Sequence, residues 1–232
     1  MNLFIDYVTI YSMNYFFENI NKNEILKYLG YRTGDVPEDI MEDIDEAISI
    51  VQRCARPKYV FRFFDKDDEI LKEIAIGRDM AELLRTSFKV ILFAVTLGNE
   101  IEMEIRKLSF TNLSMSVVAD ATASAAIEAF AEEIDKSFQK EFSDFHLTDR
   151  FSPGYGDMPI TIQNYFLTAI NAKKEIGITT TAEGIMTPRK SITAIMGVSK
   201  EVQSHRHRGC ENCRLFRNCE FRRRGENCGY ER

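Results

Sequence analysis

Near the middle of the chain lies the nearly continuous apolar run Lys89-Val90-Ile91-Leu92-Phe93-Ala94-Val95-Thr96-Leu97. Its length is that of a β-strand, and strands buried on both faces read as continuous hydrophobic runs rather than alternating ones. Gly98 follows at once and predicts the end of the strand. The sequence therefore predicts a buried central strand, and the other elements are expected to pack around it.

Further strands are predicted on both sides of this run. Residues 58–64 are rich in aromatic and β-branched side chains, which favour strands. The stretch Asp65-Lys66-Asp67-Asp68 predicts a turn, and the partial alternation of residues 69–76 predicts the second strand of a hairpin. Two later strands are expected at residues 178–181 and 191–197.

Helical periodicity fills the remaining segments. A first helix is expected to end near Gly30, and Pro37 in an acidic first turn predicts a helix over residues 35–54. Other predicted helices cover residues 79–86, 100–108, 114–142 and 160–173. Single and paired strands interleaved with helices predict an α+β fold, in which a mostly antiparallel, twisted sheet carries flanking helices.

The longest predicted helix, over residues 114–142, has two distinct faces. One face carries large apolar side chains that predict contact with the core: Ile127, Phe130, Ile134, Phe138 and Phe142. A neighbouring face carries the small residues Ala121, Ser124, Ala125 and Ala131, with Glu128 among them. Small residues allow another backbone or a ligand to approach closely. Glu128 is therefore expected either to face solvent or to point into that space.

Composition excludes several classes of protein. The chain has 232 residues, 44% of them hydrophobic and 28% charged, which is typical of soluble globular proteins and sufficient for one large or two small domains. A net charge of −6 argues against nucleic acid as a partner. We find no apolar run long enough to span a bilayer and no basic start of a secretory signal. These features predict a cytoplasmic protein without a membrane partner.

A turn flanked by functional side chains stands at Arg150-Phe151-Ser152-Pro153-Gly154-Tyr155. Proline presets φ and glycine accepts positive φ, so the Ser-Pro-Gly sequence predicts a turn. The Arg150 guanidinium fits a carboxylate or phosphate in a bidentate manner, and Tyr155 adds a flat ring with a polar tip. Two interpretations remain open from these residues alone, namely a surface turn and a ligand-binding loop.

Common enzymatic motifs are absent from the sequence. It contains neither a Walker-type phosphate loop nor a G-x-G-x-x-G motif after a strand, which argues against a dinucleotide fold and a Rossmann methyltransferase. No Ser/His/Asp or Cys/His set can be assembled, and His146 is interpreted as structural. The residues therefore predict no acid–base or nucleophilic active site.

The cysteines favour a separate C-terminal segment. Cys54 stands alone, whereas Cys210, Cys213, Cys219 and Cys228 form a C-x₂-C-x₅-C-x₈-C pattern within an arginine-rich tail. Four thiolates suffice for a tetrahedral zinc or an iron–sulfur cluster, and the alternative is a basic tail with reduced thiols. We accordingly divide the chain into an α+β domain over residues 1–203 and a Cys/Arg-rich tail over residues 204–232.

Three ordered segments resemble one family. Residues 150–155 resemble the R-x-x-P-G-Y motif of the activation domain of cobalamin-dependent methionine synthase, which binds S-adenosylmethionine. Ala119-Asp120 and the run Ile127-Glu128-Ala129-Phe130-Ala131-Glu132 resemble the long helix of that domain. Residues 186–193, Met-Thr-Pro-Arg-Lys-Ser-Ile-Thr, resemble its M-x-P-x-x-S-V-S segment. The resemblance covers roughly residues 85–200 and implies the fold of that activation domain.

The resemblance implies a role for individual residues. Arg150 would bind the carboxylate of S-adenosylmethionine, the backbone at Ser152 and Gly154 would contact the ligand, and Tyr155 would pack against it. Glu128 would face the cationic part of the ligand. The sequence departs from the family at Ile195-Met196, where the family has an aromatic pair that includes a ligand-contacting tyrosine. The acidic ligand contact that the family has near its N-terminus is not assigned here.

The implied function is reactivation of a separate protein, since nothing in the chain resembles a homocysteine, folate or cobalamin module. The protein would bind S-adenosylmethionine and support reductive methylation of cob(II)alamin on a methionine synthase or other corrinoid methyltransferase. As such it would be a component of a methyltransferase system, with an electron-donor protein as a further partner. The alternative hypothesis is a metal-binding interaction protein that keeps the fold without using S-adenosylmethionine.

Overall fold

The computed structural model describes residues 7–9, 16–31, 36–202, 217–219 and 223. Its main sheet has five strands in the order β1-β2-β3-β7-β4, and every neighbouring pair is antiparallel. The strands are β1 (Tyr7–Thr9), β2 (Lys58–Asp65), β3 (Ser87–Thr96), β4 (His146–Leu147) and β7 (Ser191–Ser199). A separate ribbon pairs β5 (Thr179–Thr180) with β6 (Met186–Thr187). The predicted α+β fold with an antiparallel sheet is thus confirmed.

β3 lies in the centre of the sheet, as its apolar run predicts. Successive side chains of a strand point to opposite faces, and here both faces are covered. Ile91, Phe93 and Val95 belong to one hydrophobic core, whereas Leu92 and Ala94 belong to the other. All five side chains are fully buried.

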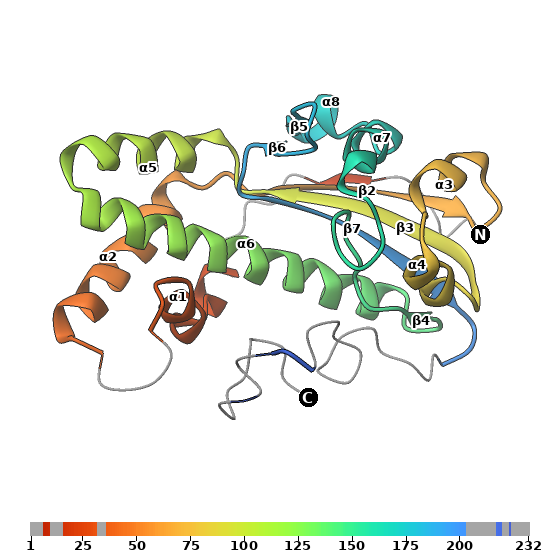
Figure 1. Cartoon of the computed structure of the whole chain (residues 1–232), viewed down its shortest axis with the longest axis horizontal. Coiled ribbons are helices and arrows are strands. Elements are labelled where there is room, and N and C mark those ends of the chain that lie inside the picture. The colour runs from red at the N-terminus through yellow and green to blue at the C-terminus, as the bar shows by residue number, and fades with distance from the viewer. Residues whose placement is uncertain (1–6, 10–15, 32–35, 203–216, 220–222, 224–232) are drawn as a thin grey trace.

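The first core lies between the sheet and a helical layer. Helix α6 (Leu113–Glu141) runs along the sheet, with the other helices of this layer packed around it (Figure 1). The Phe138 ring of α6 contacts Phe61 of β2 and Phe93 of β3 edge to face, with centroids 5.0 and 5.6 Å away. The surrounding elements are η1 (Phe16–Asn19), α1 (Lys22–Tyr28), α2 (Glu38–Cys54) and α5 (Asn99–Thr111).

The second core covers the opposite face of the sheet. Short helices cover the buried side chains of the strands here. These elements are α3 (Glu69–Ile74), α4 (Arg78–Leu83), η2 (Ile160–Ile162), α7 (Gln163–Ala169) and α8 (Ala172–Ile176). Of these, α7 and α8 lie on the other side of the sheet from α6 (Figure 1).

Two predictions for this layer were wrong. Residues 69–76 were predicted as a strand, but Glu69–Ile74 is helix α3. The Asp68 side chain accepts a hydrogen bond from the Ile70 N–H at 3.1 Å and caps the helix, while Leu71 and Ile74 are buried three residues apart. The single helix predicted over residues 160–173 is instead the 3-10 turn η2, which continues directly into α7, followed by α8. Asn171 separates α7 from α8 because it adopts a left-handed conformation at φ 56°.

The small residues of α6 serve helix packing. Ala121, Ala125 and Ala131 are buried in the first core, where α6 contacts α1, α2 and α5. Small side chains allow the neighbouring backbones to approach closely. α6 is also the one described helix that is long and apolar enough to cross a membrane, contrary to the sequence-based expectation. This is weak support for a membrane span, since most of its apolar window is buried, as in the core helix of a soluble fold.

Candidate functional site

The turn predicted at Ser152-Pro153-Gly154 is present. The Ser152 carbonyl accepts a hydrogen bond from the Tyr155 N–H at 3.1 Å, and Gly154 has φ 91°. Proline at the second position and positive φ at the third are the signature of a type II turn. A second pair of backbone bonds joins the turn to Met158, which is buried. The loop is therefore closed on itself and anchored in the second core.

Two reciprocal contacts fasten this loop to the start of α4. The Asp157 carboxylate accepts hydrogen bonds from the Arg78 and Asp79 N–H groups at 2.7 and 3.2 Å, and the Asp79 carboxylate accepts one from the Asp157 N–H at 3.2 Å. Gly77 and Gly156 have positive φ. A side chain on Gly77 would collide with Asp157, and a side chain on Gly156 would collide with Asp79. Glycine is required at both positions because the backbones approach so closely.

At its other end the loop is joined to the sheet and to α6. Phe151 forms an antiparallel bridge with Ile195 of β7, with N···O distances of 2.8 and 3.0 Å. Arg150 Nε lies 2.6 Å from Asp135 Oδ2, and Arg150 Nη2 donates a hydrogen bond to Glu132 Oε2 at 3.3 Å. The Nε contact is an ion pair without hydrogen-bond geometry. The side chains of Arg150 and Asp135 are each only 8% exposed, so the pair is buried.

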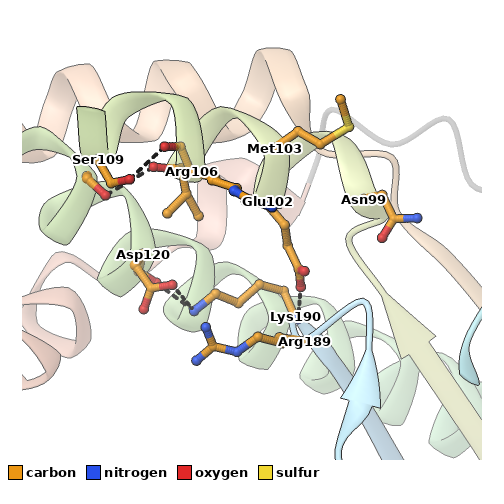
Figure 2. A pocket seen from close by; sticks show the side chains of 10 residues that line it. Asn99, Glu102, Met103, Arg106, Ser109, Asp120, Arg189 and Lys190 are labelled. Carbon is orange, nitrogen blue, oxygen red and sulfur yellow. Dashed lines mark hydrogen bonds and ion pairs between the residues drawn. The ribbon is translucent and has the colours of Figure 1, made fainter. Parts of the chain in front are cut away.

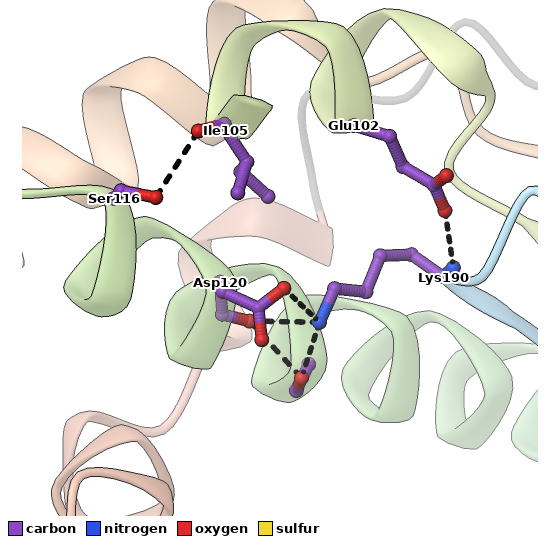
Figure 3. A network of polar contacts seen from close by, with 6 residues as sticks. Glu102, Ile105, Ser116, Asp120 and Lys190 are labelled. Atoms are coloured by element: carbon purple, nitrogen blue, oxygen red, sulfur yellow. Dashed lines mark hydrogen bonds and ion pairs between the residues drawn. The ribbon is translucent and has the colours of Figure 1, made fainter. Parts of the chain in front are cut away.

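The segment that precedes β7 is bonded to α6 in a similar way. The Lys190 ammonium pairs with the Asp120 carboxylate at 2.9 Å and donates to the Ser124 hydroxyl at 2.8 Å (Figure 3). Its backbone carbonyl accepts a hydrogen bond from Leu97 at the end of β3. Lys190 is 10% exposed in its side chain. Two nearly buried cations, Lys190 and Arg150, thus tie the other two resemblance segments to the long helix.

Between these two cations, α6 carries Glu128, an acidic residue that is not paired with a cation in the described part of the chain. Asp120, Ser124, Glu128 and Glu132 are four residues apart and therefore share one face of the helix. Asp120 and Glu132 each contact a cation, but Glu128 forms no ion pair or hydrogen bond with any residue in the described part of the chain. It lies instead close enough to Glu24 of α1 for repulsion between the two carboxylates.

This repulsion affects the pKa of the Glu24 carboxyl. Burial raises the pKa of the Glu24 carboxyl, the charge of Glu128 raises it further, and the Lys27 ammonium partly offsets both effects. Two neighbouring half-buried carboxylates are costly, and because Lys27 offsets the cost only in part, a bound positive charge would relieve it further. We take the polar face of α6, from Lys190 to Arg150, as the candidate site and call it the α6 strip.

The structure brings together most of the predicted site residues. Glu128 is half-buried on the α6 strip, and Arg150 ends the strip, although its guanidinium already contacts two carboxylates. Ser152 is half-buried, whereas Gly154 and Tyr155 are exposed on the loop, Tyr155 by 60%. Their roles toward a ligand stay predictions.

The predicted cysteine site lies mostly outside the described residues. Cys210, Cys213 and Cys228 fall in segments that the structure does not describe, and Cys219 is a half-buried free thiol. Among the described residues no group of three metal-ligating side chains occurs. The division of the chain at residue 203 and the metal ligands remain predictions.

Sequence reasoning missed three residues of the α6 strip. Glu24 lies about a hundred positions before Glu128, and no local pattern links the two. Asp135 was not singled out, although an acidic residue next to the predicted core position Ile134 predicts a cationic partner. Lys190 was quoted only within a motif. Met196, at a position where the family has an aromatic pair, is 1% exposed and faces the first core.

Comparison with known proteins supports the fold. No family model and no curated protein matches the chain. Among solved structures, the crystal structure of the MetH reactivation domain bound to AdoHcy is similar, with a TM-score of 0.65. The match covers 97% of this chain and 87% of that chain at 13% sequence identity. At such low identity the likeness shows a shared fold.

The Arg150–Asp135 pair is expected to contribute strongly to stability. We expect Arg150→Gln to lower the free energy of unfolding by about 3 kcal/mol, because the nearly buried Asp135 carboxylate loses its cation. Urea denaturation followed by circular dichroism measures this change. Asp135→Asn added to Arg150→Gln is expected to recover part of the loss. The matched control Arg189→Gln removes an exposed cation and should change stability by less than about 0.5 kcal/mol. Losses that simply add in the double variant would contradict the pairing.

Removing the Glu24 charge is expected to stabilise the protein in a pH-dependent way. Because the folded state raises the Glu24 pKa, it binds the proton more tightly than the unfolded state does. Stability contributed by this group therefore falls as pH rises through the window from the usual glutamate pKa to the raised one. We expect Glu24→Gln to raise the melting temperature at pH 7, with a gain that disappears below about pH 4. The exposed Glu46→Gln should show no such pH dependence, and a gain that persists unchanged at low pH would disprove the assignment.

Proposed function

We propose that this protein binds S-adenosylmethionine on the α6 strip and supports the reactivation of a corrinoid methyltransferase in the cytoplasm. The observation that carries the proposal is the Glu24–Glu128 pair, two half-buried carboxylates that the Lys27 ammonium neutralises only in part. The pair lies on the α6 strip between the ion pairs of Lys190 and Arg150. S-adenosylmethionine offers a sulfonium and an ammonium, which would supply the missing positive charge. The shared fold with a domain that binds AdoHcy supports the same class of ligand.

The residues of the strip suit the two ends of such a ligand. Glu128 and Glu24 would hold the cationic centres. Arg150 lies near Glu132, one helical turn further along α6, and its fork of N–H donors would hold the carboxylate. The turn places the backbone of Ser152 and Gly154 and the exposed ring of Tyr155 beside Arg150. A zwitterionic cation would thus lie along the helix with its charges matched at both ends.

Arg150 would have to share its guanidinium between internal and ligand carboxylates. Its Nε is engaged with nearly buried Asp135, but Glu132 is half exposed and binds Nη2 at 3.3 Å. An exposed ion pair contributes little to stability. Glu132 is therefore the partner that a ligand carboxylate would displace, while Asp135 would keep the guanidinium in place.

The chemistry would take place on a partner. S-adenosylmethionine supplies a methyl group, which would form a bond to the cobalt of the partner's corrinoid as the carbon–sulfur bond breaks, leaving S-adenosylhomocysteine. Starting from Co(II), this balance requires one electron from a separate donor protein. This chain would contribute positioning, which lowers the entropic cost of bringing methyl group and cobalt together. That role agrees with the lack of acid–base residues on the strip apart from its carboxylates.

An exposed apolar surface beside the loop suits such a partner. Tyr155, Ile160 and Ile185 are 60%, 42% and 58% exposed. Gly154 and Gly184 both lie against Ile160, which brings these residues together. Exposed apolar patches commonly mark interaction sites. We propose this patch as the docking surface for a methionine synthase without its own activation domain, or for another corrinoid methyltransferase.

A second function is favoured by specific observations. Arg150 already contacts two carboxylates, and Met196 is buried where the family has an aromatic pair. Both observations suit a protein that keeps the fold but does not use S-adenosylmethionine. In that case the tail cysteines would make it a metal-binding interaction protein.

Isothermal titration calorimetry separates the two functions. We expect the full chain to bind S-adenosylmethionine, and Glu128→Gln to weaken binding at least about tenfold because a charge–charge contact is lost. The loss should be smaller for S-adenosylhomocysteine, which lacks the sulfonium charge. Glu132→Gln should tighten binding, since it removes the carboxylate that competes for Arg150. Glu141→Gln, an exposed change on the same helix, is the matched control. Absence of binding of either ligand to the wild-type chain would reject the first function and favour the second.

The tail cysteines are tested separately. We propose that Cys210, Cys213, Cys219 and Cys228 hold an iron–sulfur cluster or a zinc ion, because four clustered thiolates form a suitable ligand set. A cluster at this position would pass the electron that reactivation requires. We expect anaerobically purified protein to contain iron with a visible charge-transfer band, or one equivalent of zinc, and Cys213→Ser to remove it. Protein with neither metal would refute the proposal.

A further inference from the structure

A pocket opens at the end of the sheet where β3 ends and β7 begins. It lies between α5, α6 and the loop before β7, and its volume is about 520 Å³, which is within the range of small-molecule sites (Figure 2). Its lining residues are Asn99, Glu102, Met103, Ile105, Arg106, Ser109, Ser116, Asp120, Arg189 and Lys190. Two consecutive helices and a loop that follows much later in the chain therefore contribute to one cavity.

Both carboxylates of this pocket are engaged by a single residue. Asp120 pairs with the Lys190 ammonium at 2.9 Å, and Glu102 accepts a hydrogen bond from the Lys190 backbone N–H at 3.0 Å (Figure 3). Lys190 in turn is nearly buried. These contacts fix the wall of the pocket and neutralise the ammonium. The charged lining side chains are three cations, Arg106, Arg189 and Lys190, and two carboxylates, Glu102 and Asp120, so the pocket carries an excess of positive charge.

Arg106 and Arg189 are two cations that form no ion pair with any described residue. Arg106 lies on α5 and Arg189 on the loop before β7, and both are exposed. Neither guanidinium has an ion pair or hydrogen bond with any residue that the structure describes. Two positive charges that border one cavity repel each other, and a dianion between them would turn this repulsion into attraction.

We propose that this pocket binds a phosphate group, held between Arg106 and Arg189 and carried by a small ligand. A phosphate monoester has close to two negative charges at neutral pH and can bind two guanidiniums that form no ion pair, whereas a carboxylate carries only one negative charge. The hydroxyls of Ser109 and Ser116 already donate to backbone carbonyls, so the donors to the phosphate are the arginines. Met103 and Ile105 provide an apolar wall for the body of the ligand.

The two arginines of this site are distinct from the residues proposed to hold S-adenosylmethionine. Asp120 and Lys190 belong both to the pocket wall and to the α6 strip. Glu128, however, lies eight residues further along α6, roughly 12 Å from Asp120 along the helix axis. Arg106 and Arg189, which would bind the phosphate, do not contribute to the α6 strip. The phosphate site therefore stands or falls independently of the proposed function.

Binding of two probes to the full chain tests the inference. Inorganic phosphate and phenyl phosphate are titrated in a phosphate-free buffer and followed by amide chemical shifts. We expect both to bind, phenyl phosphate more tightly because its ring packs on Met103, and acetate at least about tenfold more weakly. Arg106→Gln or Arg189→Gln should weaken both phosphates at least about tenfold. Met103→Ala should weaken only phenyl phosphate.

Two matched variants serve as controls. Lys107→Gln removes an exposed cation of α5 that is already paired with Glu104, and it should leave binding unchanged. Glu128→Gln, which should disrupt the α6 strip, should also leave phosphate binding unchanged. The inference is overturned if neither phosphate binds, if acetate binds equally well, or if both arginine variants bind like the wild type. Phosphate binding lost in Glu128→Gln would likewise overturn it, because the two sites would then be one.

Discussion

The whole architecture depends on the burial of β3 on both faces. Removing both faces of a strand from water requires a layer on each side, and the chain supplies α6 with its neighbours on one side and α7 and α8 on the other. Phe93 on one face and Leu92 on the other are both fully buried. Apolar burial of this kind is the dominant favourable contribution to folding. β7 pairs with β3 along its length. The burial of β3 therefore also positions residues 150–155, which bridge to β7, and residues 186–193, which lead into it.

Electrostatics then fixes these motifs against the long helix. The Arg150 and Lys190 side chains are nearly buried, and each reaches an acidic residue of α6. Buried ion pairs contribute little net stability over apolar contacts, but they are costly to break and so specify position. Between them, Glu24 and Glu128 remain as a carboxylate pair that Lys27 neutralises only in part. Two paired cations thus hold the motifs against α6, and an excess of negative charge remains between them.

Sequence patterns predicted the features that depend on residues close together in the chain. The apolar run at residues 89–97 implied a doubly buried strand, and the Pro153-Gly154 pair implied the type II turn that forms. Residues 69–76 were misread because a short capped helix and a half-buried strand share similar apolar spacing, and the Asp68 cap decided the outcome. Contacts between distant residues could not be predicted. Glu24 meets Glu128, and Arg150 meets Asp135, only through the packing of whole helices.

The interlock of Asp79 and Asp157 has a consequence for recognition. Three backbone N–H groups and two glycines hold residues 150–158 in one conformation before any ligand arrives. A loop that is already ordered loses little conformational entropy when it binds. The free energy of each contact that the loop makes is then available for affinity instead of for ordering the chain. A mutation at Gly77 would displace Asp157 and loosen the loop. It would accordingly weaken ligand binding at the loop, although Gly77 itself lies outside residues 150–158.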